Sequence, residues 1–130
     1  MREELELQMS AQERYDMFIG RIVESGAVWG LKSKENGSWA VAPSNSFEDT
    51  GVMVFWCDKS DAEKCIAEEW AEHGATSIPL NVFMSNWLVG LDGDGLLVGV
   101  NWNTDLVGIE VEPIDLLEDI QSLEDKLKTL

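Results

Sequence analysis

Residues 99–113, GVNWNTDLVGIEVEP, place one tryptophan between two asparagines and two runs of β-branched residues. The apolar runs at 96–100 and 106–111 have the length of strands and lie close enough in sequence to form a β-hairpin. Residues 102–105 are then its loop. Pro113 suits the first position of a helix, because the nitrogen there needs no hydrogen-bond partner within the helix. The stretch therefore predicts a hairpin followed directly by a helix.

The side chain of Trp102 is the unexplained part of this hairpin. A ring of that size is costly to leave in water at the tip of a loop, so it covers the chain's own core or contacts a partner. Its neighbours Asn101, Asn103 and Asp105 are typical turn residues, and they are also suitable polar contacts for a ligand. The sequence leaves both interpretations open.

Upstream of the hairpin, helical and strand-like segments alternate. Ser10 and Glu13 form a capping box at the start of an amphipathic helix, and Asn36-Gly37 is a turn signal between two strand-like runs. The predicted elements are a helix between Ser10 and Gly26, strands at 28–31, 39–41 and 52–56, a helix from Asp58 or Ser60 to Gly74, an extended connection at Ile78-Pro79, and a helix from Val82 to Gly90 capped by Asn81.

The order of elements is therefore α-β-β-β-α-α-β-β-α, which predicts an α+β fold. We expect a mostly antiparallel sheet of about five strands, two hairpins plus one strand, packed with about four helices. Residues 10–130 form a single domain in this interpretation, consistent with the length of the chain. Residues 1–9 fit neither a helical nor a strand period and stay unassigned.

The predicted last helix carries an apolar seam at alternating spacings of four and three. Its members are Leu116, Ile120, Leu123, Leu127 and Leu130. A seam of two heptads is short for an independent coiled coil, so packing on the sheet is favoured over its use as a dimer seam. The sequence thus leaves a monomer or a homodimer open.

Charge is distributed unevenly along the chain, whose formal net charge is −16. Residues 1–64 hold twelve acids against seven bases, a net of −5, and residues 65–130 hold thirteen against two, a net of −11. Such a surface repels phosphates, which argues against nucleic-acid binding. The negative charge keeps the protein soluble, or it steers a basic protein toward the acidic C-terminal half.

The sequence shows no apolar run that could span a bilayer and no signal peptide, so we expect no membrane association. Cys57 and Cys65 are too few for a disulfide framework, which favours a reduced, cytoplasmic setting.

The sequence lacks groups of residues with the spacing of a metal site or of a catalytic site. Cys57, Cys65 and the single histidine, His73, stand at eight-residue intervals that do not suit one zinc ion. The stretch Asp92-Gly93-Asp94-Gly95 resembles a calcium loop but has Leu96 where an oxygen ligand is needed. We therefore predict no metal and no cofactor, and a non-enzymatic function is favoured over an enzymatic one.

Landmarks spread along the chain form an ordered series: Arg14-Tyr15 with Phe18, Val28-Trp29-Gly30-Leu31, Phe55-Trp56, Cys65 with Trp70, Ile78-Pro79-Leu80 with Phe83 and Trp87, Asp94-Gly95 with Val98-Gly99-Val100, and Gly108-Ile109-Glu110-Val111-Glu112-Pro113. The series resembles a family of small bacterial proteins catalogued as domain of unknown function 2750, over roughly Arg14 to Ile120. The resemblance implies a size and a fold, and no activity.

Two functions follow from these observations. The first is a cytoplasmic interaction module, immunity-like or regulatory, whose acidic C-terminal half, including Glu110 and Glu112, binds a basic protein. The alternative is a small-ligand-binding or enzymatic domain with an aromatic pocket near Trp56 and Trp102. The six tryptophans are compatible with both functions. Trp70 and Trp87 lie on apolar helix faces, Trp29 and Trp39 flank the first predicted hairpin, and Trp56 and Trp102 lie at strand ends.

Overall fold

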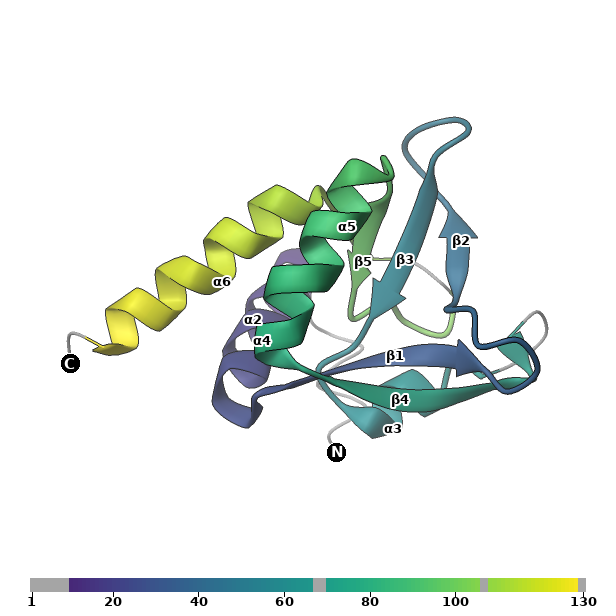
Figure 1. Ribbon diagram of the computed structural model, residues 1–130, viewed down its shortest axis with the longest axis horizontal. Helices are drawn as coiled ribbons and strands as arrows, with labels where there is room; N and C mark the ends of the chain where they lie inside the picture. Colours follow the sequence, from purple (N-terminus) through teal and green to yellow (C-terminus); the bar gives the residue numbers. More distant parts are fainter. Residues whose placement is uncertain (1–9, 67–69, 106–107, 129–130) are drawn as a thin grey trace.

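The computed structural model describes residues 10–66, 70–105 and 108–128 and confirms an α+β fold (Figure 1). The unassigned segment 1–9, and the parts of predicted elements at Ala67, 106–107 and Leu130, lie outside the described residues. The elements in chain order are α2 (Ala11–Ser25), β1 (Ala27–Ser33), β2 (Val41–Pro43), β3 (Gly51–Phe55), α3 (Lys59–Glu63), β4 (His73–Pro79), α4 (Leu80–Val82), η2 (Phe83–Trp87), α5 (Leu88–Gly93), β5 (Leu97–Val100), β6 (Ile109–Val111) and α6 (Pro113–Lys128).

Helix α2 begins and ends where local signals place it. The Glu13 N–H donates to the Ser10 side-chain oxygen at 3.1 Å, and the Ser10 N–H donates to the Glu13 carboxylate at 3.3 Å, which completes the predicted capping box. The helix ends at Gly26, whose φ of 74° is left-handed and costs glycine little. Phe18 and Ile22 on its inner face are fully buried.

The strands of the described residues form two sheets. The larger has the order β2-β3-β5-β6, and the smaller is the antiparallel pair β1-β4. The β3–β5 pair is parallel and the other pairs of named strands are antiparallel, so the prediction of a mostly antiparallel arrangement is confirmed. Two backbone hydrogen bonds between Trp29 and Trp56, at 2.7 and 2.8 Å, join the two sheets.

The first predicted hairpin is present but short, and β1 makes its longer pairing with another strand. The chain does turn at Asn36-Gly37, where Gly37 has a φ of 74°, and Lys32 and Trp39 form an isolated bridge. Strand β1, however, pairs along its whole length with β4, and β2 pairs with β3. Strand β1 uses both of its edges. One edge pairs with β4 over seven residues, and on the other the Ser33 N–H donates to the Ser38 carbonyl at 2.7 Å and the Ala40 N–H to the Leu31 carbonyl at 2.8 Å.

Strand β4 takes the last two residues of a predicted helix and includes the extended connection predicted at Ile78-Pro79. Helix α3 ends at Glu63 and is capped by Asp58, whose carboxylate accepts from the Ser60 N–H at 2.9 Å. The prediction of a helix reaching Gly74 is therefore wrong, and His73 begins a strand instead of lying in a last helical turn. Pairing with β1 overrides the weak strand preference of this segment, which contains glycine, serine and proline.

The predicted helix at 82–90 is longer than expected. Helical structure runs from Leu80 to Gly93 through α4, η2 and α5, with a π-helical turn at η2. Asn81 lies inside this helix, so its predicted role as a cap is wrong; Pro79 precedes the first turn. Phe83 is fully buried, whereas Trp87, which the sequence places on an apolar helix face, is half-buried.

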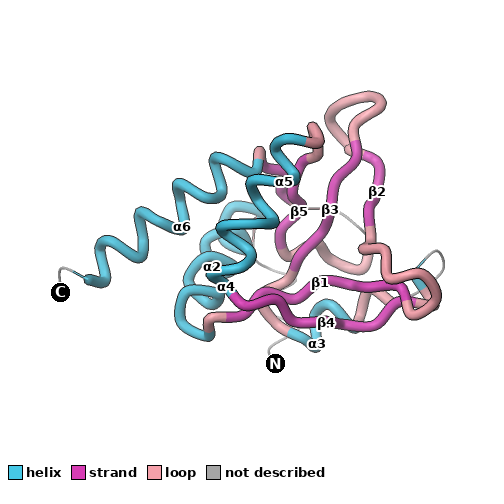
Figure 2. Tube along the Cα trace, in the orientation of Figure 1, coloured by secondary structure: helices cyan, strands magenta, loops and turns pink. Residues whose placement is uncertain are grey.

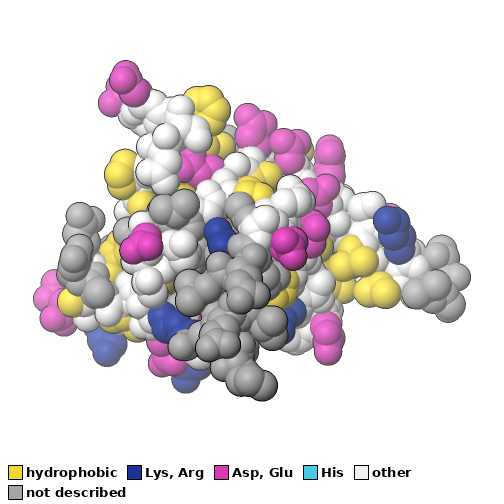
Figure 3. Space-filling model, turned by 180° about the vertical axis from the view of Figure 1, so that it is seen from behind, with side chains coloured by type: hydrophobic (Ala, Val, Ile, Leu, Met, Phe, Trp, Pro, Cys, Tyr) yellow, Lys and Arg dark blue, Asp and Glu magenta, His cyan; other side chains and the backbone are white. Residues whose placement is uncertain are grey.

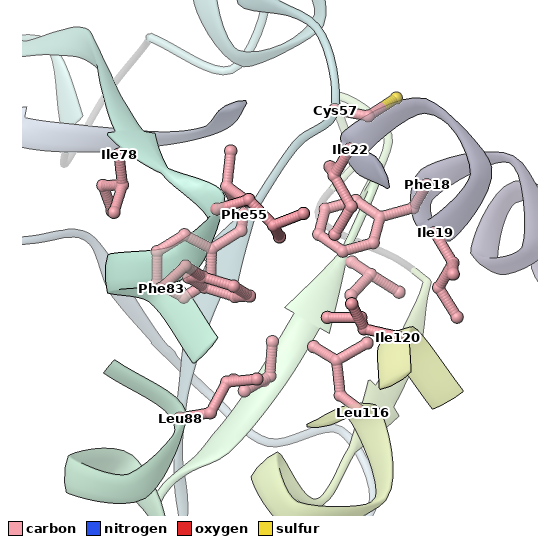
Figure 4. Packing of buried hydrophobic residues seen from close by; sticks show 14 of the residues in the cluster. Phe18, Ile19, Ile22, Phe55, Cys57, Ile78, Phe83, Leu88, Leu116 and Ile120 are labelled. Atoms are coloured by element: carbon pink, nitrogen blue, oxygen red, sulfur yellow. The ribbon is translucent and has the colours of Figure 1, made fainter. Parts of the chain in front are cut away.

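Figure 2 shows α2, α4, α5 and α6 gathered on one side of the strands. Buried residues nevertheless cover both faces of the larger sheet. One face packs against α2, α5 and α6 in the core of Figure 4, where Phe18 and Ile22 of α2 lie near Phe55 of β3 and Ile120 of α6. The other face packs against β1 and the α3 region. The buried residues of this second cluster are Leu31, Ala40, Ala42, Val52, Val54, Trp56, Ala62, Cys65, Trp70 and Trp102.

Helix α6 begins at Pro113, as predicted, and its first half belongs to the core. Leu116 and Ile120 are fully buried, Leu123 is half-buried and Leu127 is exposed. Contact with a second copy could thus use only the later part of the seam, since Figure 1 shows this end of α6 projecting from the body.

The side chains of Tyr15 and Asp119 tie α2 to α6, because the phenol donates a hydrogen bond to the carboxylate. Burial, together with that bond and the Asp119 charge, raises the pKa of Tyr15 well above its usual range. None of the helices in the described ranges is long and apolar enough to cross a bilayer.

Candidate functional site

The predicted closing hairpin is present, and Trp102 folds back onto it. Strands β5 and β6 pair from Val98 opposite Val111 to Val100 opposite Ile109. The Trp102 indole lies so close to two glycines that a Cβ on Gly99 would come within 2.7 Å of it, and one on Gly108 within 2.5 Å.

The indole N–H of Trp102 donates to the Ile109 carbonyl at 3.0 Å, and the residue is 3% exposed. Trp102 therefore covers the chain's own core.

Trp56 lies directly beneath the Trp102 backbone. Its side chain is fully buried, and its indole N–H donates to the Trp102 carbonyl at 3.0 Å. Both indole nitrogens are thus engaged within the protein, and these two buried tryptophans form an apolar floor.

Asn101 connects three segments that are distant in sequence. Its side-chain oxygen accepts from the Cys57 N–H at 3.0 Å, and its side-chain nitrogen donates to the Arg14 carbonyl at 3.3 Å. The residue has a φ of 48°, a left-handed conformation that asparagine tolerates better than most residues. Asn101 thereby joins the end of β5 to α2 and to the residue following Trp56.

These residues surround one cavity, which we call the α2–α3 pocket, with a volume of about 280 Å³. It is only slightly smaller than the roughly 300–1,000 Å³ typical of small-molecule sites. The residues that line it are Arg14 and Met17 of α2, Trp56, Asp61 of α3, Lys64, Cys65, and Asn101, Trp102, Asn103 and Thr104 of the β5–β6 loop.

The rim of the α2–α3 pocket is charged. Arg14 and Lys64 contribute two cations, and Asp61 contributes a carboxylate. The Lys64 ammonium lies 3.7 Å from the Asp61 carboxylate, and their side chains are 39% and 15% exposed. An ion pair in contact with solvent contributes little stability, roughly 0–1 kcal/mol.

Cys65 offers a thiol and not a thiolate to the pocket. Its sulfur is buried and lies 3.9 Å from the Trp102 carbonyl and 3.7 Å from that of Asn103. Burial raises the pKa of Cys65 to about 11, and burial also raises the pKa of Cys57. The nucleophilic form of a cysteine is the thiolate, so neither sulfur is activated at neutral pH.

Four of the predicted site residues, Trp56, Asn101, Trp102 and Asn103, line the α2–α3 pocket together. Asp105 does not line it; this residue is exposed, and its N–H donates to the Asn103 side chain at 3.0 Å in a local turn.

The two predicted acidic positions of the last strand region also lie outside the pocket lining. Glu110 binds the loop after β2, accepting from the Ser44 hydroxyl and from the Asn45 N–H at 2.7 Å. Glu112 is exposed between β6 and α6. The Glu110 carboxylate therefore anchors the loop after β2 of the same chain.

The remaining lining residues were not predicted from the sequence. Arg14 and Met17 are three residues apart, as are Asp61 and Lys64, so each pair lies on one side of a helix. That spacing is a local signal for a shared face. The sequence carries no signal that the faces of these two particular helices meet at the β5–β6 loop.

Metal ligation has no support in the part of the chain that the structure describes, where no group of three or more His, Cys, Asp or Glu side chains could hold an ion. His73 lies at the start of β4 and does not line the α2–α3 pocket.

The fold and the pocket define a small α+β domain with a cavity between α2, α3 and the β5–β6 hairpin. The family model described as "Protein of unknown function (DUF2750)" matches residues 15–120, and the chain belongs to that family. This confirms the resemblance seen in the sequence landmarks. No curated protein and no solved structure matches the chain.

Proposed function

We propose that this protein binds a small molecule in the α2–α3 pocket. The observation that carries the proposal is the convergence of Trp56, Asn101, Trp102 and Asn103 with two cations and a carboxylate on one cavity of about 280 Å³. Small-molecule sites combine an apolar lining with a few placed polar groups, and this cavity has both.

Hydrogen bonds within the protein support a preformed pocket. The Trp56 indole is bonded to the loop above it, and the Asn101 amide joins that loop to α2. A site held in shape before the ligand arrives loses little conformational entropy on binding. Selectivity then depends on the rim, because the floor's indole N–H groups are already used.

Binding is favoured over catalysis by the chemistry of the lining. Cys65 is the nucleophile nearest the floor, and its raised pKa keeps it protonated at neutral pH. The lining residues include no histidine that could serve as its base.

The experiment that tests this proposal is a ligand screen read by NMR on protein carrying ¹⁵N-labelled tryptophan, with indole signals assigned by single Trp→Phe variants. A ligand in the α2–α3 pocket should shift the indole signals of Trp56 and Trp102. The signals of Trp29 and Trp39, which do not line the pocket, should stay unchanged. Shifts confined to those two would contradict the proposed location.

A variant that fills the mouth supplies the matched control. Thr104 is exposed and lines the pocket, so Thr104→Trp should abolish the shifts. Asp105→Trp places the same ring on the same turn at an exposed residue outside the lining, and it should leave binding intact. Equal effects of the two substitutions would show that the turn matters and the cavity does not.

A second candidate function is favoured by a separate observation, the acidic surface of the C-terminal half. Exposed acids follow the end of α5 and the length of α6, and Figure 3 shows acidic side chains over much of this side. They include Asp92, Asp94, Glu112, Asp115, Glu118, Asp119 and Asp125. Such a surface would steer a basic protein toward it and lose that advantage at high salt.

A pull-down with paired charge variants tests this second candidate. Asp92→Asn, Asp94→Asn, Asp115→Asn and Glu118→Gln together should release a partner captured by the parent at low salt. A control that neutralises Glu24, Glu35, Glu48 and Asp49 removes as much charge from the first half and should retain it. Equal loss from both variants would indicate only non-specific attraction.

We also infer a cytoplasmic location. Cys57 and Cys65 are both free and buried, which suits a reducing compartment.

A further inference from the structure

We infer that the ligand of the α2–α3 pocket is a small organic monoanion with an apolar body. This inference rests on the proposed small-molecule binding and names the chemical class. It starts from charge placement: the chain holds only nine Lys and Arg residues against 25 acids, yet two of the nine, Arg14 and Lys64, line this one cavity.

Arg14 is placed at the pocket by contacts that do not use its charge. Its main-chain carbonyl accepts from the Asn101 side chain at 3.3 Å, which holds this turn of α2 against the β5–β6 loop. Its Nε is shielded from solvent, so the side chain lies along the protein. A guanidinium presents a planar set of donors that matches a carboxylate or a phosphate.

Lys64 supplies a second and more adaptable cation. Its ion pair with Asp61 is partly exposed and therefore weak, so the ammonium can turn toward a ligand anion at little cost. Both cations already make contacts within the chain, and a ligand anion would add to these or replace them. A flexible ammonium beside a rigid guanidinium accommodates several anion geometries.

Asp61 limits the charge of the ligand. The rim carries two cations and one carboxylate, a net of one positive charge, which matches one negative charge on the ligand. A polyanion would leave charge unpaired beside Asp61. An apolar body is favoured by the apolar part of the lining, where Met17 is half-buried and the buried Trp56 and Trp102 lie behind it.

The overall charge of the protein does not oppose this assignment at close range. A net charge of −16 repels anions from a distance. Fields of exposed charges are screened beyond about 8 Å at physiological salt, so groups in the rim dominate the energy of a bound ligand.

The test compares three probes of one shape: benzoate, benzamide and benzylamine, which differ in charge. Each is titrated into the full chain with the indole signals of Trp56 and Trp102 as the readout. Further pairs, each carboxylate with its amide and each sulfonate with its sulfonamide, extend the series of monoanions and neutral partners. We expect each anion to bind at least about tenfold more tightly than its neutral partner, the effect of one charge-assisted hydrogen bond.

Two pairs of variants assign the effect to the rim. Arg14→Gln and Lys64→Gln should each weaken benzoate binding by about tenfold and change benzamide binding by no more than about twofold. Arg21→Gln on α2 and Lys59→Gln on α3 remove a cation from the same helices outside the pocket lining and should leave both affinities unchanged. The remaining indole signals report that each variant is folded.

The possible results separate the two proposals. If benzamide matches benzoate, or if benzylamine binds most tightly, the monoanion assignment is overturned and small-molecule binding stands. If the control variants weaken benzoate as much as the pocket variants, the anion is drawn by general charge and the assignment also fails. If none of the matched pairs shifts the Trp56 and Trp102 signals, both proposals are overturned.

Discussion

Replacing Gly99 with alanine tests whether the Trp102 ring is part of the core. An added Cβ would lie 2.7 Å from the indole Cε2 and Nε1, so the ring must be displaced by about 0.7 Å to restore an ordinary contact of 3.4 Å. The ring has little room to move, because it also touches Gly108 and is bonded to the Ile109 carbonyl. We expect Gly99→Ala to lower the free energy of unfolding by about 1–3 kcal/mol.

The assay is urea unfolding followed by far-UV circular dichroism, which does not depend on tryptophan emission. Gly90→Ala is the control, since nothing lies within 4 Å of its added Cβ, and it should raise stability by roughly 0.5–1 kcal/mol through helix propensity. Trp102→Leu removes the contacted ring atoms and itself costs on the order of 3 kcal/mol.

In the Trp102→Leu background the cost of Gly99→Ala should fall by about 1 kcal/mol or more. An equal cost in both backgrounds, or a stabilising Gly99→Ala, would refute the packing that places Trp102 inside.

Three further outcomes are expected. The free energy of unfolding should fall as the pH rises from 9 to 11, because the folded state keeps the Cys65 proton that the unfolded chain releases first; Cys57 and Tyr15, whose pKa values are also raised, add to this fall. Urea titrations of Cys65→Val at the same pH values should show a shallower fall, and an unchanged slope would assign the effect elsewhere. Asn101→Ala should lose about 2–4 kcal/mol, since it leaves the buried Cys57 N–H without its acceptor and keeps a left-handed residue, and Asn101→Gly should lose less. Thermal unfolding ranks the two, and the reverse order would contradict the role of the backbone. Leu116→Ala should cost about 2–5 kcal/mol and Leu127→Ala under about 1 kcal/mol by urea unfolding, and a large effect at Leu127 would point to contact with a second copy, which sedimentation velocity would detect.

Local chemistry explains the parts of the fold that were predictable. Ser10, Glu13 and Gly26 define α2 through contacts within a few residues, and Pro113 starts α6 for the same kind of reason. The hairpin of β5 and β6 also joins neighbours in sequence.

The parts that escaped prediction depend on partners far along the chain. Strand β4 exists because β1 pairs with it, and its own residues, His73–Pro79, have no alternating pattern. The parallel β3–β5 pair likewise joins segments separated by α3, β4 and the long helix. The local sequence of such a segment allows a helix or a strand, and pairing within the complete sheet determines which one forms.

For a related reason, the floor of the α2–α3 pocket was predictable from the sequence and its rim was not. Its floor comes from residues near strand ends, where the sequence placed Trp56 and Asn101 to Asn103. Its rim comes from Arg14 and Lys64, which stand fifty residues apart and meet only in three dimensions.

The contact between Tyr15 and Asp119 also constrains the order in which the chain can fold. These residues are separated by 104 positions, so during synthesis α2 emerges long before the helix that covers it. Until α6 is released, Phe18 and Ile22 lack part of their cover, and closing so long a loop is slow. The native packing of α2 therefore cannot be completed before α6 has been synthesised.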